Sequence, residues 1–167
     1  TEFRDNKVAL FALVVVILMI FLALFASLIS PQNPYDLANL SLMDSRRPPG
    51  FVGSGGYTHV LGTDPQGRDL LSAIFYGLRI SIQIGLAAGF VSLTIGTALG
   101  IAAAYLGGRV EALIMRLVDL QLSFPAILLA LVIVALLGQG KAQLIGALVA
   151  AQYAYFARTA YGAAKAE

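Results

Sequence analysis

The sequence predicts an all-α integral membrane protein: a polytopic bundle with about four transmembrane helices, joined to a loop-rich outer segment. Of its 167 residues, 59% are hydrophobic and only 12% are charged, and the mean hydropathy is +0.83. Soluble domains are about 45–50% apolar and about 25% charged, so this composition favours a membrane protein. Four apolar stretches without a charged residue supply the helices that would cross the bilayer.

The composition also excludes several classes of function. The chain has no cysteine and one histidine, so it can form neither a disulfide nor a metal cluster of cysteines or histidines. Its formal net charge of +2 comes without a basic stripe, which argues against a nucleic-acid partner. We therefore expect no metal, no cofactor and no nucleic acid.

The first apolar stretch, residues 8–29, contains 22 residues and would reach about 33 Å as a helix, enough to cross a hydrocarbon core of about 30 Å. Arg4 and Lys7 precede it, whereas the next basic residue on its far side is Arg46. Because basic residues gather on the cytoplasmic side, residues 1–29 are predicted to be a cytoplasmic N-terminus followed by the first span.

Residues 30–79 form the predicted outer segment, on the extracytoplasmic side. Four prolines and a glycine-rich run forbid any long regular element there: Pro31, Pro34, Pro48, Pro49 and residues 53–56. Apolar residues recur at helical spacing near its end, which predicts a short helix over 70–76 leading back to the bilayer.

The second span is predicted over residues 80–106. Its small residues recur at intervals of three or four and fall within an arc of about 80° on one helix face. Small residues on one face let the backbone of a neighbouring helix approach closely, so this face is expected to be a packing seam. The seam consists of Gly85, Gly89, Ser92, Gly96, Gly100 and Ala103, continuing to Gly107.

The predicted membrane part covers residues 80–167. After the second span it continues with an amphipathic helix over 109–119. A third span of minimal length is predicted over 120–137, although it contains Pro125. A fourth is predicted over 142–157. Alternation from a cytoplasmic N-terminus places residues 107–109 and 158–165 inside and Lys141 outside.

Residues 61–69, Leu-Gly-Thr-Asp-Pro-Gln-Gly-Arg-Asp, form the densest polar motif. Thr63 or Asp64 can cap a helix or form a turn, and Gly62 and Gly67 permit tight turns. Arg68 is expected to bridge Asp64 and Asp69. We interpret the motif as a structural and gating element whose members are Gly62, Thr63, Asp64, Gly67, Arg68 and Asp69.

Other polar residues give weaker signals. Arg116 and Asp119 lie three residues apart on one helix and are expected to form an ion pair near the cytoplasmic interface. His59 is expected to be a surface or loop residue. No catalytic residue is predicted. Gly138–Lys141 lacks the pattern of a phosphate loop, and one histidine cannot supply the two that an HExxH motif needs. No Gly-x-Ser-x-Gly motif of a serine nucleophile occurs either.

Several blocks of the sequence, taken in order, resemble the inner-membrane permease subunit of the dipeptide/oligopeptide class of ABC importers, a class that includes nickel permeases. These blocks are residues 29–34 (ISPQNP), 61–69 (LGTDPQGRD), 76–81 (YGLRIS), 105–108 (YLGG), 115–119 (MRLVD) and 123–125 (SFP). The similarity extends over nearly the whole chain.

The resemblance implies a non-enzymatic translocation subunit of the bacterial cytoplasmic membrane, with six spans in the family. Such a permease forms a heterodimer with a homologous permease, binds two cytoplasmic ATP-binding subunits and receives substrate from an extracytoplasmic binding protein. The sequence ends at Glu167, before the position of the family's EAA-type coupling loop and last two spans, so this stretch is not expected to transport by itself.

Two other readings of the sequence stay open. A nickel permease of the same class would carry the same motifs, because the binding protein largely sets the substrate in this family. A non-transporting helical membrane scaffold would share the apolar stretches but gives no purpose to residues 61–69. An intramembrane serine protease is disfavoured because no serine–histidine pairing is apparent.

Overall fold

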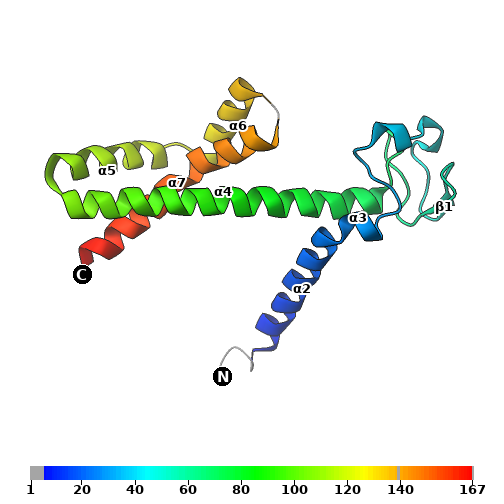
Figure 1. Ribbon diagram of the computed structural model, residues 1–167, viewed down its shortest axis with the longest axis horizontal. Helices are drawn as coiled ribbons and strands as arrows, with labels where there is room; N and C mark the ends of the chain where they lie inside the picture. The colour runs from blue at the N-terminus through cyan, green and yellow to red at the C-terminus, as the bar shows by residue number, and fades with distance from the viewer. Residues whose placement is uncertain (1–5, 139, 167) are drawn as a thin grey trace. The chain divides into compact units, whose positions relative to one another are not determined.

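The computed structural model of the chain describes residues 6–138 and 140–166. The chain forms two compact units, Thr1–Gln83 and Ile84–Glu167, and one long helix, α4, runs from the first unit into the second. Figure 1 shows the helices of both units and the small hairpin that belongs to the first.

In the first unit, helix α2 (Lys7–Leu24) begins at Asn6, whose side-chain oxygen accepts hydrogen bonds from Val8 and Ala9. Its apolar side chains are exposed almost throughout, as expected of a helix whose solvent is lipid. Phe25 separates it from the short helix α3 (Ala26–Ile29), which ends where Ser30 turns extended before a proline.

The outer segment folds into short elements that follow α3. Two 3₁₀ turns, η1 (Leu37–Asn39) and η2 (Leu42–Asp44), precede an antiparallel hairpin of β1 (Phe51–Val52) and β2 (Thr58–His59). In the hairpin, Phe51 lies opposite His59 and Val52 opposite Thr58. The segment therefore has little regular structure, as its prolines and glycines predict.

Helix α4 spans Leu70–Leu106 without interruption, so the short helix predicted over 70–76 and the span predicted over 80–106 are parts of one helix. Nothing between these two stretches can end a helix: they contain no proline, and Gly77 alone is tolerated in an apolar helix. At 37 residues α4 is about 55 Å long, well beyond the roughly 30 Å of a hydrocarbon core.

The second unit packs the end of α4 with three further helices: α5 (Gly108–Leu122), α6 (Ala126–Leu137) and α7 (Lys141–Ala166). A turn with positive φ at Gly107 and Gly108 reverses the chain, so that α5 runs back beside the end of α4 (Figure 1). The buried core draws on α4, α5 and α7 and consists of Ala103, Met115, Val118, Ala154 and Ala157.

The predicted third span over 120–137 is divided. Helix α5 ends at Leu122, α6 begins after Pro125, and the two are bent by 90°. Proline removes one backbone N–H donor and disfavours helical geometry at Phe124 before it, which explains the break. With 12 residues α6 is only about 18 Å long, too short to cross a bilayer by itself.

Fewer helices qualify as spans by length and composition than the four predicted. Within the described part of the chain, two helices, α2 and α4, are long and apolar enough to cross a membrane, or three spans if α5 and α6 together count as one. Helix α7 is longer than the predicted fourth span over 142–157, but it continues into a polar end. The fold class, a helical membrane bundle, is confirmed.

Candidate functional site

The polar motif of residues 61–69 is held by a turn centred on Asp64. Its carboxylate accepts hydrogen bonds from the backbone N–H groups of Gln66 at 2.8 Å and Arg68 at 3.0 Å, and from Arg68 Nε at 2.7 Å. Burial opposes the charged form of Asp64, but the bonds from Arg68 and Gln66 outweigh it and hold the pKa of that carboxyl below its usual value. Asp64 therefore acts as the fixed acceptor of the turn.

Thr63 joins this turn to the chain before the hairpin. Its hydroxyl accepts from the Arg47 N–H at 2.8 Å and donates to the Asp44 carbonyl, while its own N–H donates to the Arg47 carbonyl at 3.1 Å. All three bonds cross more than fifteen residues of sequence. The motif thus fastens the middle of the outer segment.

Two glycines of the motif are needed for this close packing. Gly62 and Gly67 both have positive φ, and a side chain at either would run into backbone. A Cβ at Gly62 would meet the Arg47 carbonyl, and one at Gly67 would meet the Ser41 carbonyl. Both glycines therefore lie in turns, as predicted, and each lies where two main-chain segments come into contact.

Asp69 closes the motif and begins α4. Its side chain is buried and accepts from the N–H and the hydroxyl of Ser72, each at 2.7 Å, which caps the helix. Its backbone N–H donates to Gln32 Oε1 at 2.7 Å, so the residues after α3 are attached at the same point. His59 Nδ1 lies 2.9 Å from its other carboxylate oxygen.

Two sequence predictions fail here. Arg68 bonds Asp64 but does not bridge to Asp69, because within the described residues both oxygens of Asp69 are taken by His59 and Ser72. His59 is not a surface residue: it is 1% exposed and packs between aromatic rings of the hairpin. The Asp-x-x-Ser spacing of a helix cap at residues 69–72 was readable from the sequence, but the histidine's partner was not.

Asp44 is a further member of this cluster that sequence reasoning missed. It is buried and accepts from the Ser54 hydroxyl at 2.6 Å and the Ser54 N–H at 2.9 Å. These bonds, with smaller help from the charges of His59 and Arg47, hold the pKa of Asp44 below its usual value despite burial. We name the group Asp44, Ser54, His59, Thr63 and Asp69 the outer cluster.

The second unit carries a separate set of charged contacts between α5 and α7. Asp119 pairs with Arg158 of α7 rather than with Arg116, which is exposed, so the predicted pair within one helix is wrong. Glu111 accepts from the Tyr161 hydroxyl and pairs with Lys165 at 3.1 Å. In each of these contacts the two partner residues lie 39 or more positions apart in the sequence. Spacing along one helix therefore cannot predict them.

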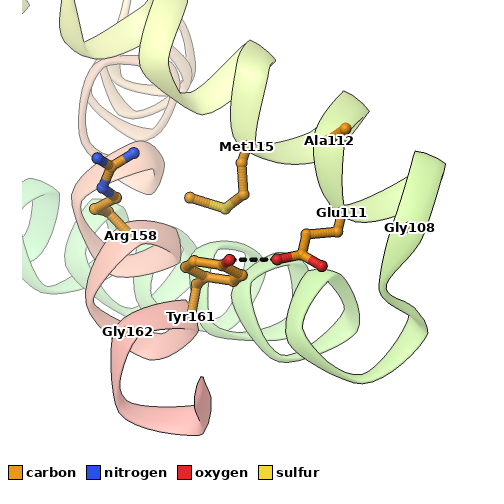
Figure 2. A pocket seen from close by; sticks show the side chains of 7 residues that line it. All are labelled: Gly108, Glu111, Ala112, Met115, Arg158, Tyr161 and Gly162. Atoms are coloured by element: carbon orange, nitrogen blue, oxygen red, sulfur yellow. Dashed lines mark hydrogen bonds between the residues drawn. The ribbon is translucent and has the colours of Figure 1, made fainter. Parts of the chain in front are cut away.

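Between these contacts lies a pocket of about 460 Å³. Figure 2 shows the Tyr161 ring and the Glu111 carboxylate facing each other across its floor, with Met115 and Arg158 at its side. Each of its charged groups already has a partner, since Glu111 holds Tyr161 and Arg158 holds Asp119. The arrangement clamps two helices together and presents no free nucleophile or base.

The predicted packing face of α4 is used in part. A Cβ at Gly96 would overlap the Tyr153 carbonyl and lie 2.6 Å from Phe156 Cβ, and one at Gly100 would overlap the Ala157 carbonyl. Ser92 and Ala103 are fully buried on the same face. Among the described residues, no atom outside the local helix lies within 4 Å of the position that a Cβ would take at Gly85 or Gly89, so α7 packs only on the later half of the predicted face.

Comparison with known families places this architecture. Residues 1–49 match the model described as the N-terminal TM domain of oligopeptide transport permease C, and residues 96–166 match the binding-protein-dependent transport system inner membrane component. The first match includes Asp44 of the outer cluster, the other four members lie between the two matches, and the second match includes the packed end of α4. The chain belongs to the family of inner-membrane permease components.

Relatives agree with this assignment. The chain is 42% identical over 139 residues to the di/tripeptide transport system permease protein DppC of Pseudomonas aeruginosa. The aligned residues make up 83% of the chain and 45% of that protein. It is 32% identical over 161 residues to the oligopeptide transport system permease protein OppC of Bacillus subtilis, covering 96% and 50%. It is 36% identical over 164 residues to the glutathione transport system permease protein GsiD of Pectobacterium atrosepticum, covering 96% and 51%. The chain therefore spans about half the length of these relatives.

Proposed function

We propose that this chain is part of the transmembrane permease subunit of an ABC importer that moves peptides across the bacterial cytoplasmic membrane. The observation that carries the proposal is the 42% identity to a di/tripeptide permease over 83% of the chain, a range that reaches beyond either single family match. The permease forms a path and performs no covalent chemistry. ATP hydrolysis on partner subunits drives transport.

The partners follow from this assignment. A homologous permease completes the pathway as a heterodimer, two ATP-binding subunits attach on the cytoplasmic side, and a substrate-binding protein delivers peptide from outside. The N-terminus lies in the cytoplasm and the outer cluster faces the binding protein's side, which the lysine and arginine asymmetry around α2 supports.

Residues 61–69 act as a structural and gating element within this permease. Their polar groups are committed to one another and to the neighbouring turns, so few remain to contact a peptide. A rigid junction between the first span and α4 would transmit movement of one to the other. Specificity among peptides is then set elsewhere, chiefly in the binding protein.

Uptake in a strain that lacks the gene encoding this chain tests the proposal. Restoring the complete gene should restore uptake of a labelled dipeptide, and unlabelled dipeptide should compete with it. Nickel uptake that is restored while dipeptide uptake is not would favour a nickel permease of the same class. Restoration of neither, with the protein present in the membrane, would favour a non-transporting scaffold.

A further inference from the structure

A polar pocket of about 300 Å³ lies in the outer segment. It is lined by Pro31, Gln32 and Asn33, which follow α3, and by Gly55 and Tyr57 of the loop that joins β1 to β2. Pockets for small molecules measure about 300–1,000 Å³, so this one can take a single residue of a peptide but not a whole oligopeptide. Its size therefore fits one end of a peptide.

Two side chains of the pocket are held in place by the rest of the outer segment. Gln32 is 6% exposed, and its Oε1 atom accepts a hydrogen bond from the Asp69 N–H at 2.7 Å. The Tyr57 ring is half-buried and meets the His59 ring edge-on, with the ring centroids 5.0 Å apart. Gly55 leaves room for the Tyr57 ring, because a Cβ at that position would overlap it. The aromatic wall of the pocket is therefore fixed before a ligand arrives.

Asn33 and Tyr57 supply groups that favour a positively charged donor. Asn33 Oδ1 accepts a hydrogen bond from the Tyr35 N–H at 3.1 Å, and an amide oxygen has a second lone pair. Because Asn33 is exposed, that lone pair is accessible to a ligand. The face of a tyrosine ring attracts a cation that lies within about 6 Å of the ring centroid. A ligand that carries an ammonium group can use both.

The charges next to the pocket have the same preference. Burial raises the pKa of the Tyr57 phenol, and the charges of Asp69 and Asp44 raise it further. Tyr57 therefore lies in the negative field of two buried carboxylates. Arg47 opposes this field as a single positive charge, and its guanidinium is bonded to a main-chain carbonyl. The pocket thus favours the amino end of a peptide over its carboxylate end.

We propose that this pocket binds the N-terminal ammonium group of the transported peptide, with Asn33 Oδ1 as hydrogen-bond acceptor and the Tyr57 ring against the charge. The inference rests on the proposed function in peptide transport. A metal cation fits less well, because the described residues include no group of three histidine or acidic side chains that could hold one. Every unmodified peptide has this ammonium group, so the pocket recognises peptides as a class and leaves the preference among them to the binding protein.

Ligand-observed NMR tests this interaction directly, as saturation transfer to dialanine from the complete permease in detergent, without a binding protein. N-acetyl-dialanine keeps the carboxylate but lacks the ammonium group, so its signal should be severalfold weaker. Dialanine amide keeps the ammonium group and should bind at least as well as dialanine. Equal signals from dialanine and its acetylated form, a loss confined to the amide, or no signal from any of the three would each overturn the proposal.

Variants locate the site on the chain. Tyr57→Leu removes the ring and should weaken dialanine binding severalfold, whereas Tyr57→Phe keeps the ring and should retain most of it. Gly55→Leu displaces the Tyr57 ring and should also weaken binding. Tyr105→Leu, at an exposed position of the other unit, is the matched control and should bind as the wild type does. Equal binding by the wild type, Tyr57→Leu and Gly55→Leu would overturn the proposal, and if these variants fail to fold, the three ligands compared on the wild type decide.

Failure of this pocket can be told apart from failure of the proposed function. Uptake of a labelled dipeptide by cells that carry the complete gene tests peptide transport without reference to the pocket. Restored uptake combined with binding that does not depend on the ammonium group would refute the pocket alone.

Discussion

At the scale of single residues, the outer segment is held by side chains that each satisfy several backbone groups. Asp64 accepts three hydrogen bonds within one turn, and Asp69 caps α4 while it holds His59. Charge-assisted bonds of this kind are stronger than neutral ones and cost more when one partner is removed. The segment can therefore be ordered although it contains little helix or strand.

Replacing Arg68 should affect all substrates alike. Arg68 holds the Asp64 turn and is one-third exposed, so Arg68→Ala loosens a structural element without removing a contact to peptide. In the complete permease, uptake of every peptide should fall by a similar factor, with relative preferences unchanged. Competition between peptides with free and amidated C-termini measures this. A loss confined to peptides with a free carboxylate would mean that Arg68 binds substrate.

Acid should weaken the same segment through Asp44. Because the pKa of Asp44 is lower in the folded protein than in the unfolded chain, its stabilisation is present above the unfolded value and is lost as the pH falls through the folded one. The thermal unfolding midpoint of the chain in detergent should therefore fall below about pH 4, near the ordinary pKa of aspartate. Asp44→Asn should remove this acid-dependent step, and a wild-type step that persists in that variant would assign it to another carboxyl.

At the scale of elements, α4 owes its packing to small residues placed where another helix crosses. Gly96 and Gly100 allow the α7 backbone to come close enough that a Cβ would overlap it. Close backbone approach gains dispersion contacts over the whole crossing, which matters in lipid because apolar side chains gain little from burial there. Gly85 and Gly89 belong to the same face by spacing but have no such neighbour within residues 6–138 and 140–166.

The glycine positions should differ sharply in tolerance. Gly96→Leu must push α7 away, and overpacking of this kind costs about 1–3 kcal/mol. Gly85→Leu and Leu93→Phe, at exposed positions of the same helix, should be mild. Thermal unfolding in detergent compares the three variants. Equal midpoints for Gly96→Leu and Gly85→Leu would show that the crossing does not depend on close approach.

At the scale of the whole molecule, the family assignment and the apolar helices define a membrane permease component, and its orientation is a proposal. Charge asymmetry around α2 predicts an inside N-terminus, an outside segment over 30–77 and an inside position for Arg158. Inside and outside alternate with each crossing. The side on which the C-terminal end lies therefore depends on whether α5 and α6 together cross the membrane, which makes that end the sharper test.

Cysteine labelling measures this orientation, since the chain has no cysteine of its own. In intact cells that produce the complete protein, Ser54→Cys should react with an impermeant maleimide and Ala164→Cys should not. Both residues are exposed in the structure. Permeabilised cells provide the control in which both react. The reverse pattern in intact cells would invert the topology.

The sequence by itself determined the fold class, the first span and the turn-forming role of residues 61–69, because apolar length, proline and glycine act locally. The tertiary structure alone decided which polar side chains meet: His59 with Asp69, Asp44 with Ser54, and Asp119 with Arg158. It also decided that Pro125 divides a predicted span and that only half of the glycine face is covered. The physical reason is that these outcomes depend on which distant segments come into contact, whereas residue spacing reports only neighbours along one helix.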